Sequence, residues 1–177
     1  MRGLYFGGRV TRELLRDPLS YIFCLLTPMG MQLMFFIIWS NVPEAGRANV
    51  EIFRADTLAP GIAYFGFSFV MLFGSLLLSR VRSTAFLTRL YATPMTAGDF
   101  LLGYAHPHFV PGIGQMVLTF SFAAILGAVG GTPLSLAGVL RTAIALLPSL
   151  AFFVGVGLLF GALLSENAAP GLVSVVI

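Results

Sequence analysis

The chain has 177 residues, of which 58% are hydrophobic and 10% are charged. A soluble domain carries about 25% charged residues, so this composition excludes an ordinary soluble fold. The formal net charge is +3, and all ten basic residues are arginines beside apolar runs, a pattern that argues against a nucleic-acid partner. The single cysteine, Cys24, lies inside an apolar run, so no disulfide framework is possible.

Residues 1–18 are rich in arginine. Apolar side chains are interleaved with the four arginines of this segment, which are Arg2, Arg9, Arg12 and Arg16. This pattern predicts a short helix lying on the cytoplasmic surface of a membrane, and a solvated tail is the alternative. Asp17 and Pro18 then predict the start of a membrane helix, because aspartate caps free amides and proline is tolerated at the first helical position.

Four long apolar runs follow. A helix needs about 20 predominantly apolar residues to cross about 30 Å of hydrocarbon. Runs of this length occupy residues 19–39, 58–79, 99–129 and 137–164, and a fifth apolar stretch covers residues 168–177. The sequence therefore predicts an all-α, polytopic transmembrane helix bundle with four complete spans and an unfinished fifth, as expected of a fragment of a longer protein.

Prolines predict interruptions inside these spans. Pro28 predicts a kink in the first span, and Pro148 predicts an interruption of the fourth. Pro107 and Pro111 lie close to two glycines, so we expect the third span to be broken into a short first helix and a main crossing.

Two polar residues are the expected helix caps. Thr96-x-x-Asp99 predicts a capping box that starts the third span near Ala97, with aspartate in place of the usual glutamate or glutamine. Thr132 is the expected cap of the fourth span.

The arginines are distributed unequally between the two sides of the membrane. One side would hold seven of them, namely Arg2, Arg9, Arg12, Arg16, Arg80, Arg82 and Arg89, and the other side Arg47, Arg54 and Arg141. Because cytoplasmic loops carry an excess of basic residues, the N-terminus is expected in the cytoplasm.

Polar residues within the spans offer little catalytic chemistry. His106 and His108 flank a proline, and polar residues at a helix break explain them better than a metal site does. Gln115 is expected to bond to a neighbouring helix rather than to line a cavity. Arg141 is expected to reach the headgroups, with a role in substrate passage as the alternative. No G-x-x-x-x-G-K-[ST] sequence is present, so ATP hydrolysis by that route is excluded.

Gly157 and Gly161 have the G-x-x-x-G spacing that allows two membrane helices to approach closely. This pair predicts helix packing, either inside the domain or at a subunit interface.

The loop at residues 80–98 is the most informative segment. A short amphipathic helix is predicted over residues 83–92, since its apolar side chains share one face and its arginines do not. The apolar face consists of Phe86, Leu87, Leu90 and Tyr91. Thr93 and Pro94 end this helix, because the residue before a proline avoids the helical region. Such a helix favours a protein partner, and a helix resting on lipid is the alternative.

The sequence from Phe86 to Tyr104 resembles the first cytoplasmic loop of ABC transporter permeases of the type-2 exporter class. The Arg16-Asp17-Pro18 segment and the Pro60-Gly61 pair are also similar to that family's pattern. One departure is Arg82-Ser-Thr-Ala85, which occupies the stretch where many members carry a glutamate and a glycine. In topology the resemblance covers essentially the whole chain.

The resemblance implies a coupling helix that docks on a separate ABC ATPase subunit. The ATPase-coupling residues would be Arg82, Phe86, Leu87, Arg89, Leu90, Tyr91, Thr93 and Pro94. It further implies six spans, a second permease copy, and export of a drug-, lipid- or glycan-like substrate across a bacterial-type plasma membrane. ATP and magnesium would bind to the partner, so no cofactor is expected on this chain.

Two other classes of protein remain as alternatives at this point. One is an ATPase-independent scaffold or channel subunit, in which changes to the loop would leave function intact. The other is an intramembrane enzyme, which would need clustered carboxylates or histidines at one depth, and the predicted spans are nearly free of both.

Overall fold

The structure is a computed structural model that describes residues 18–82, 96–164, 168 and 171. Four long helices dominate it: α2 (Pro18–Asn41), α4 (Ala55–Arg82), α6 (Ala97–Val129) and α7 (Leu136–Leu163). A short helix, α3 (Glu44–Arg47), and a 3-10 helix, η1 (Ala48–Phe53), connect α2 to α4. The part of the chain that the structure describes contains no strand, which confirms the predicted all-α class.

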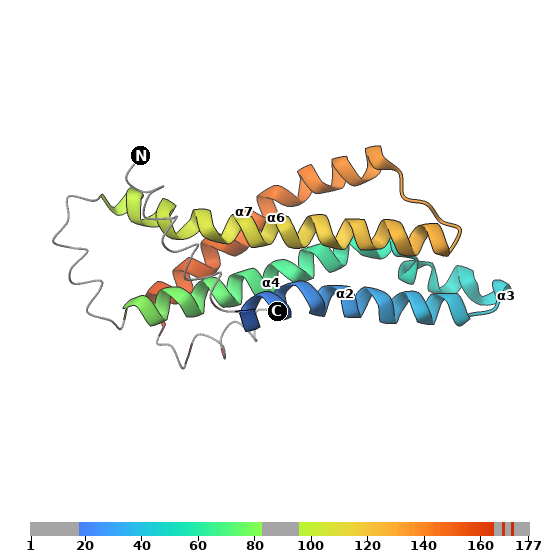
Figure 1. The fold of residues 1–177 in the computed structure, drawn as a ribbon, viewed down its shortest axis with the longest axis horizontal. Helices are drawn as coiled ribbons and strands as arrows, with labels where there is room; N and C mark the ends of the chain where they lie inside the picture. Colours follow the sequence, from blue (N-terminus) through green and yellow to red (C-terminus); the bar gives the residue numbers. More distant parts are fainter. Residues whose placement is uncertain (1–17, 83–95, 165–167, 169–170, 172–177) are drawn as a thin grey trace.

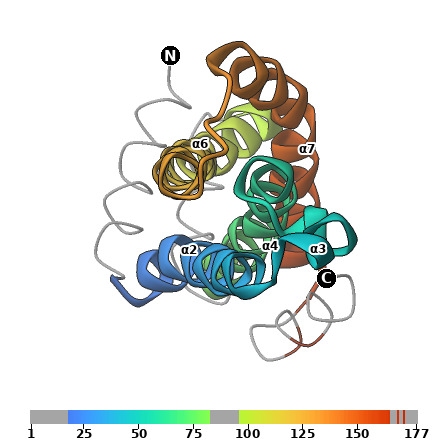
Figure 2. The ribbon, with the colours of Figure 1, turned by 90° about the vertical axis from the view of Figure 1, so that its right-hand side faces the viewer.

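The long helices form a bundle with α4 at its centre. Figure 1 shows α2, α4 and α6 lying side by side, and the end-on view in Figure 2 shows α4 between the other three. Helix α4 packs against α2, α6 and α7. We call the end of the bundle that carries α3 and the α6–α7 connection the α3 end. The end where α4 finishes and α6 begins is the opposite end.

All four long helices are long and apolar enough to cross a membrane. Their bounds lie within a few residues of the four predicted spans. The predicted surface helix at residues 1–18 lies outside the described residues except for Pro18, and so does most of the fifth stretch at residues 168–177.

The predicted break in the third span is wrong. Helix α6 continues from Ala97 to Val129 with Pro107 and Pro111 inside it, and α7 likewise runs through Pro148. Each proline removes one backbone hydrogen bond, but tight contacts with neighbouring helices hold the path of the chain. A Cβ at Gly112, for example, would lie 2.4 Å from Leu150 Cδ1 of α7. Packing of this kind is what allows proline inside membrane helices.

The capping box at Thr96 is confirmed, whereas the predicted cap at Thr132 is wrong. Ser135 caps α7 instead, accepting a weak bond from the N–H of Gly138 at 3.5 Å. The reason is the turn after α6: Gly131 has a φ of +73°, and the N–H of Thr132 donates back to the carbonyl of Gly127 at 2.7 Å. Residues 132–135 are not helical, so the cap lies three residues later than expected, whereas α7 begins at Leu136, next to the predicted start of the fourth span at residue 137.

Contacts with α7 are concentrated in its second half. Every buried residue of α7 lies at or after Leu150. Figure 1 shows the first half of α7 (orange) diverging from the bundle near the α3 end, while the second half (red) lies along α4. The core therefore centres on the middle of α4, where Phe67 and Met71 are fully buried.

Candidate functional site

The predicted coupling loop connects two central helices of the bundle. Arg82 is the last residue of α4, and Thr96 caps the start of α6. The remaining predicted coupling residues lie outside the described residues, namely Phe86, Leu87, Arg89, Leu90, Tyr91, Thr93 and Pro94. The two ends of the loop meet the bundle at the same end, as Figure 1 shows.

The start of α6 after this loop is held by reciprocal hydrogen bonds. The backbone N–H of Asp99 donates to Thr96 Oγ1 at 3.3 Å, and the N–H of Thr96 donates to the Asp99 carboxylate at 3.2 Å. These bonds satisfy two amides that a helix terminus otherwise leaves free. A cap of this kind limits fraying at the start of α6.

The predicted glycine pair of α7 packs on the backbone of α4. A Cβ at Gly157 would lie 2.7 Å from the carbonyl oxygen of Met71, and a Cβ at Gly161 would lie 2.7 Å from that of Ser75. Side chains at these positions would overlap with α4, so glycine is what permits the close approach. These contacts place both glycines inside the domain.

Helix α6 meets α4 through polar side chains that pack over glycines. A Cβ at Gly66 would lie 1.8 Å from Gln115 Nε2, and a Cβ at Gly74 would lie 3.1 Å from His108 Cδ2. Gln115 therefore fills the space that Gly66 leaves empty.

The expected hydrogen bond from Gln115 to a neighbouring helix is wrong. Its Nε2 donates to Thr119 Oγ1 of the same helix at 3.3 Å. Gly66 has no side chain that could offer a hydrogen-bond partner, so α4 and α6 meet here by van der Waals packing.

The two histidines have different surroundings. His106 is exposed, while His108 is 2% exposed and has its Nδ1 2.6 Å from the carbonyl oxygen of Tyr104. A carbonyl oxygen only accepts, so we assign the proton to Nδ1, which leaves Nε2 as an acceptor. No group of three metal-binding side chains occurs within residues 18–82 and 96–164.

Three buried polar residues, Gln32 of α2 and His108 and Gln115 of α6, have unpaired side-chain atoms, and we refer to these residues together as the polar seam. Both amide atoms of Gln32, Nε2 of His108 and Oε1 of Gln115 have no protein partner. Unpaired polar groups inside a span are costly, and polar residues at such positions often mark functional sites. Chemically, the seam offers one amide donor and three acceptors, so it can bind water or hydroxyl groups.

Sequence reasoning singled out Gln115 and His108 but missed Gln32. The available signal was an amide inside an otherwise apolar run. What the sequence did not show is its complete burial, with 0% of the side chain exposed.

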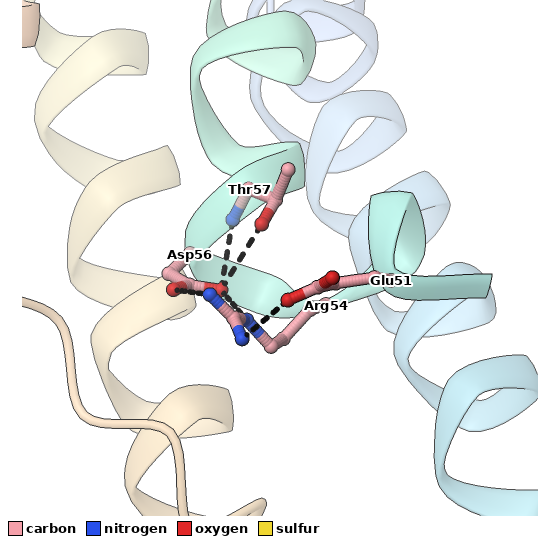
Figure 3. Close-up of polar contacts among 4 residues, drawn as sticks. All are labelled: Glu51, Arg54, Asp56 and Thr57. Carbon is pink, nitrogen blue, oxygen red and sulfur yellow. Dashed lines mark hydrogen bonds and ion pairs between the residues drawn. The ribbon is translucent and has the colours of Figure 1, made fainter. Parts of the chain in front are cut away.

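A cluster of ion-paired side chains lies at the start of α4, at the α3 end of the bundle. Arg54 bonds through two nitrogens to the two carboxylate oxygens of Asp56 at 2.6 and 2.8 Å, and contacts Glu51 at 2.9 Å. Figure 3 shows the guanidinium of Arg54 between these two acids. Partial burial raises the pKa of Asp56, but the hydrogen bond and charge of Arg54 outweigh it, so this pKa lies below its ordinary value.

The same acid also orders the start of α4. Asp56 accepts a hydrogen bond from the N–H of Thr57 at 2.9 Å. The cluster therefore ties the α2–α4 connection to the helix it precedes. Arg141 takes no part in it and is exposed near the start of α7.

The fold and these surroundings define a multi-pass membrane protein built as a helix bundle. The family model described as ABC-2 type transporter matches residues 6–177. The chain belongs to this family and is a membrane permease of an ABC-type transporter. A search of curated proteins found no match. A search of solved structures also found none.

Proposed function

We propose that the chain is the permease subunit of an ATP-driven exporter and that its 80–98 loop docks on a separate ATPase subunit. The observation that carries this proposal is the attachment of the loop. It joins α4, which packs against all three other long helices, to α6, whose first turn is firmly capped. A displacement of the loop would thus be transmitted through α4 and α6 to the other helices of the bundle.

The proposed mechanism is a two-state movement of the bundle. ATP binding would close a pair of ATPase subunits, press on the coupling helix and favour an outward-open packing of two permease copies. ATP and magnesium would be held by the ATPases. The N-terminus and the 80–98 loop would face the cytoplasm, the α3 end would face outward, and the exported substrate would be drug-, lipid- or glycan-like.

The polar seam supports a bundle with more than one packing. A helix interface with unpaired amide and imidazole atoms is not fully satisfied in this arrangement. We infer that these groups gain hydrogen-bond partners when α2 and α6 move relative to α4.

The coupling helix is tested by one charge placed on either of two faces. Leu90→Asp puts a carboxylate on the predicted apolar face, and Thr88→Asp puts the same charge away from it. We expect Leu90→Asp to release the ATPase in a detergent pull-down, because desolvating a carboxylate in an apolar interface is costly. Thr88→Asp should retain the ATPase.

The elution volume and helical circular dichroism of both variants serve as the folding control. If Leu90→Asp retains the ATPase as the unmodified chain does, the coupling-helix assignment is wrong. If export also continues without any ATPase, the scaffold or channel alternative replaces the proposal.

A further inference from the structure

The end of α2 carries two aromatic side chains that pack on the turn between α6 and α7. Trp39 is the single tryptophan of the chain, lies in the last turn of α2 and is 7% exposed. The ring centroids of Trp39 and Phe36 are 6.1 Å apart. A Cβ at Gly130 would lie 2.9 Å from Phe36 Cε2 and 3.1 Å from Trp39 Cζ3. The glycine thus allows the backbone of the turn to approach both rings.

The connection that follows α2 packs back on the same helix. Phe53 of η1 stacks on Phe35 of α2, with ring centroids 5.0 Å apart and an angle of 11° between the rings. The guanidinium carbon of Arg47 lies 5.1 Å from the centre of the Trp39 ring, and Arg47 Nε donates to the carbonyl oxygen of Val42 at 3.2 Å. The end of α2 and its connection therefore form one packed unit, in which Arg47 orients the indole.

The two contacts of the indole differ in kind. Arg47 is attracted to the face of the Trp39 ring by its charge, and its own hydrogen bond holds it in place. The contact with the α6–α7 turn joins ring carbons to the backbone of Gly130 and is held by van der Waals attraction, which is weak for each pair of atoms. When the two elements separate, Arg47 stays with Trp39 and the turn moves away.

Trp39 lies where the membrane-spanning part of α2 ends. This span finishes at Asn41, and the charged residues Glu44 and Arg47 follow directly in α3. Charged side chains mark the water side of this boundary, and the half-polar ring of tryptophan suits the interface between membrane and water. An indole that has lost its contact with the turn therefore remains in favourable surroundings, so two arrangements of this end are accessible.

We propose that Trp39, oriented by Arg47, is a latch that holds α2 against the α6–α7 turn and controls the opening of the α3 end. In the closed arrangement the turn at Gly130 rests on the rings of Phe36 and Trp39. Opening moves the turn away from both rings. The proposal rests on the proposed export function for the statement that the α3 end is the exit, whereas the latch itself is measured without an ATPase.

The single tryptophan allows the contact to be measured by fluorescence, because an indole quenches a bimane that lies beside it. Val129 precedes Gly130 and is exposed, and Cys24 is the single cysteine. Val129→Cys in a Cys24→Ala background thus places one bimane at the turn, and the labelled protein is reconstituted in phosphatidylcholine vesicles. We expect Trp39→Phe, which removes the quencher and keeps an aromatic ring, to raise the emission. Unchanged emission would overturn the proposed contact.

The role of Arg47 is tested with a matched loss of charge. Arg47→Met removes the cation over the ring, and Arg141→Met removes an exposed arginine near the start of α7. A cation–π contact at an exposed site corresponds to about a two- to fivefold change in an equilibrium. Arg47→Met should shift the ratio of open to closed latch by this factor and raise the emission part of the way to the Trp39→Phe value.

Two comparisons complete this test of the latch. Arg47→Lys keeps a cation at this position and should restore most of the quenching, and Arg141→Met should leave the quenching unchanged. If Arg47→Met and Arg141→Met have the same effect, Arg47 does not hold the latch and the proposal is wrong. Helical circular dichroism of each variant serves as the folding control.

Opening is tested on the complex with the ATPase. Trapping the labelled complex with ATP and vanadate should raise the bimane emission, and this rise should be absent in Trp39→Phe. Unchanged emission in a complex that retains its ATPase would overturn the control of opening by Trp39. If no ATPase binds in the pull-down, the proposed function fails, while the response to Arg47→Met still supports or overturns the latch.

Discussion

The packing of α7 on α4 predicts that two glycines two residues apart respond oppositely to the same substitution. A Cβ at Gly157 would lie 2.7 Å from the carbonyl oxygen of Met71 and 3.0 Å from its Cα, so the backbone of α4 would have to move. A Cβ at Gly155 would meet nothing within 4 Å. The pair Gly157→Ala and Gly155→Ala therefore separates packing from backbone flexibility.

The magnitudes follow from two opposing terms. Alanine stabilises a helix interior by roughly 0.5–1 kcal/mol relative to glycine, and both variants gain this term. Overpacking costs typically 1–3 kcal/mol, and this cost applies to Gly157→Ala because its first contacts are backbone atoms. We expect Gly155→Ala to be neutral or stabilising and Gly157→Ala to be destabilising, with a difference of about 1–3 kcal/mol.

The assay is equilibrium unfolding of the purified protein in mixed micelles, titrated with sodium dodecyl sulfate and followed by circular dichroism. Gly161→Ala, which meets Ser75 in the same way, should behave like Gly157→Ala. The costs of these two should add incompletely in the double variant, because one displacement of α7 relieves both contacts. Equal stability of Gly155→Ala and Gly157→Ala would refute the close α4–α7 contact.

Three further predictions follow from the other contacts of the bundle. Gly66→Ala should destabilise the fold by about 1–2 kcal/mol, because Gln115 occupies the space beside Gly66. In a double-mutant cycle, Gln115→Ala should relieve most of that cost. A coupling energy near zero between the two substitutions in the same titration would contradict this contact. Gln32→Met keeps the side-chain length and removes both unpaired amide atoms, so it should be neutral or stabilise the fold by about 1–3 kcal/mol, and clear destabilisation would mean that partners exist. Because the pKa of Asp56 is lowered in the folded state, its ionised carboxylate stabilises the fold above the ordinary pKa of 3.8, and this stability is lost as the pH falls through the folded-state pKa. Asp56→Asn should therefore reduce the loss of stability in acid. If the unfolding free energies of Asp56→Asn and the unmodified chain depend identically on pH, the stabilising ion pair with Arg54 is contradicted.

The polar seam and the glycine contacts together make α4 the element on which the proposed mechanism depends. Its Gly66 and Gly74 receive side chains of α6, while its Met71 and Ser75 receive the glycines of α7. Contacts of this kind transmit small displacements, because closely packed surfaces do not deform gradually. Leu90→Asp therefore tests the proposed contact between the loop and the ATPase. Gly157→Ala tests the contact between α4 and α7 inside the bundle.

The four spans, the capping box at Thr96 and the membership of a permease family could be read from the sequence, because each depends on neighbours along the chain. An apolar run of sufficient length must form a helix in lipid, since every backbone group has to be satisfied within it. The same local rules failed at Pro107 and Pro111, where contacts with other helices hold α6 together. They also failed at Thr132, whose place at the cap is taken by Ser135 after the turn at Gly131.

Only the tertiary structure decided which faces of the helices meet. The sequence marks Gln115, Gly157 and Gly161 as unusual residues within their spans, but their neighbours come from a helix distant in the chain. Nothing in the local pattern shows that Gln115 packs over Gly66 or that Gln32 is buried completely. A crevice of about 350 Å³ between α6 and the first half of α7 likewise depends on where α7 diverges from the bundle, which contacts between helices determine.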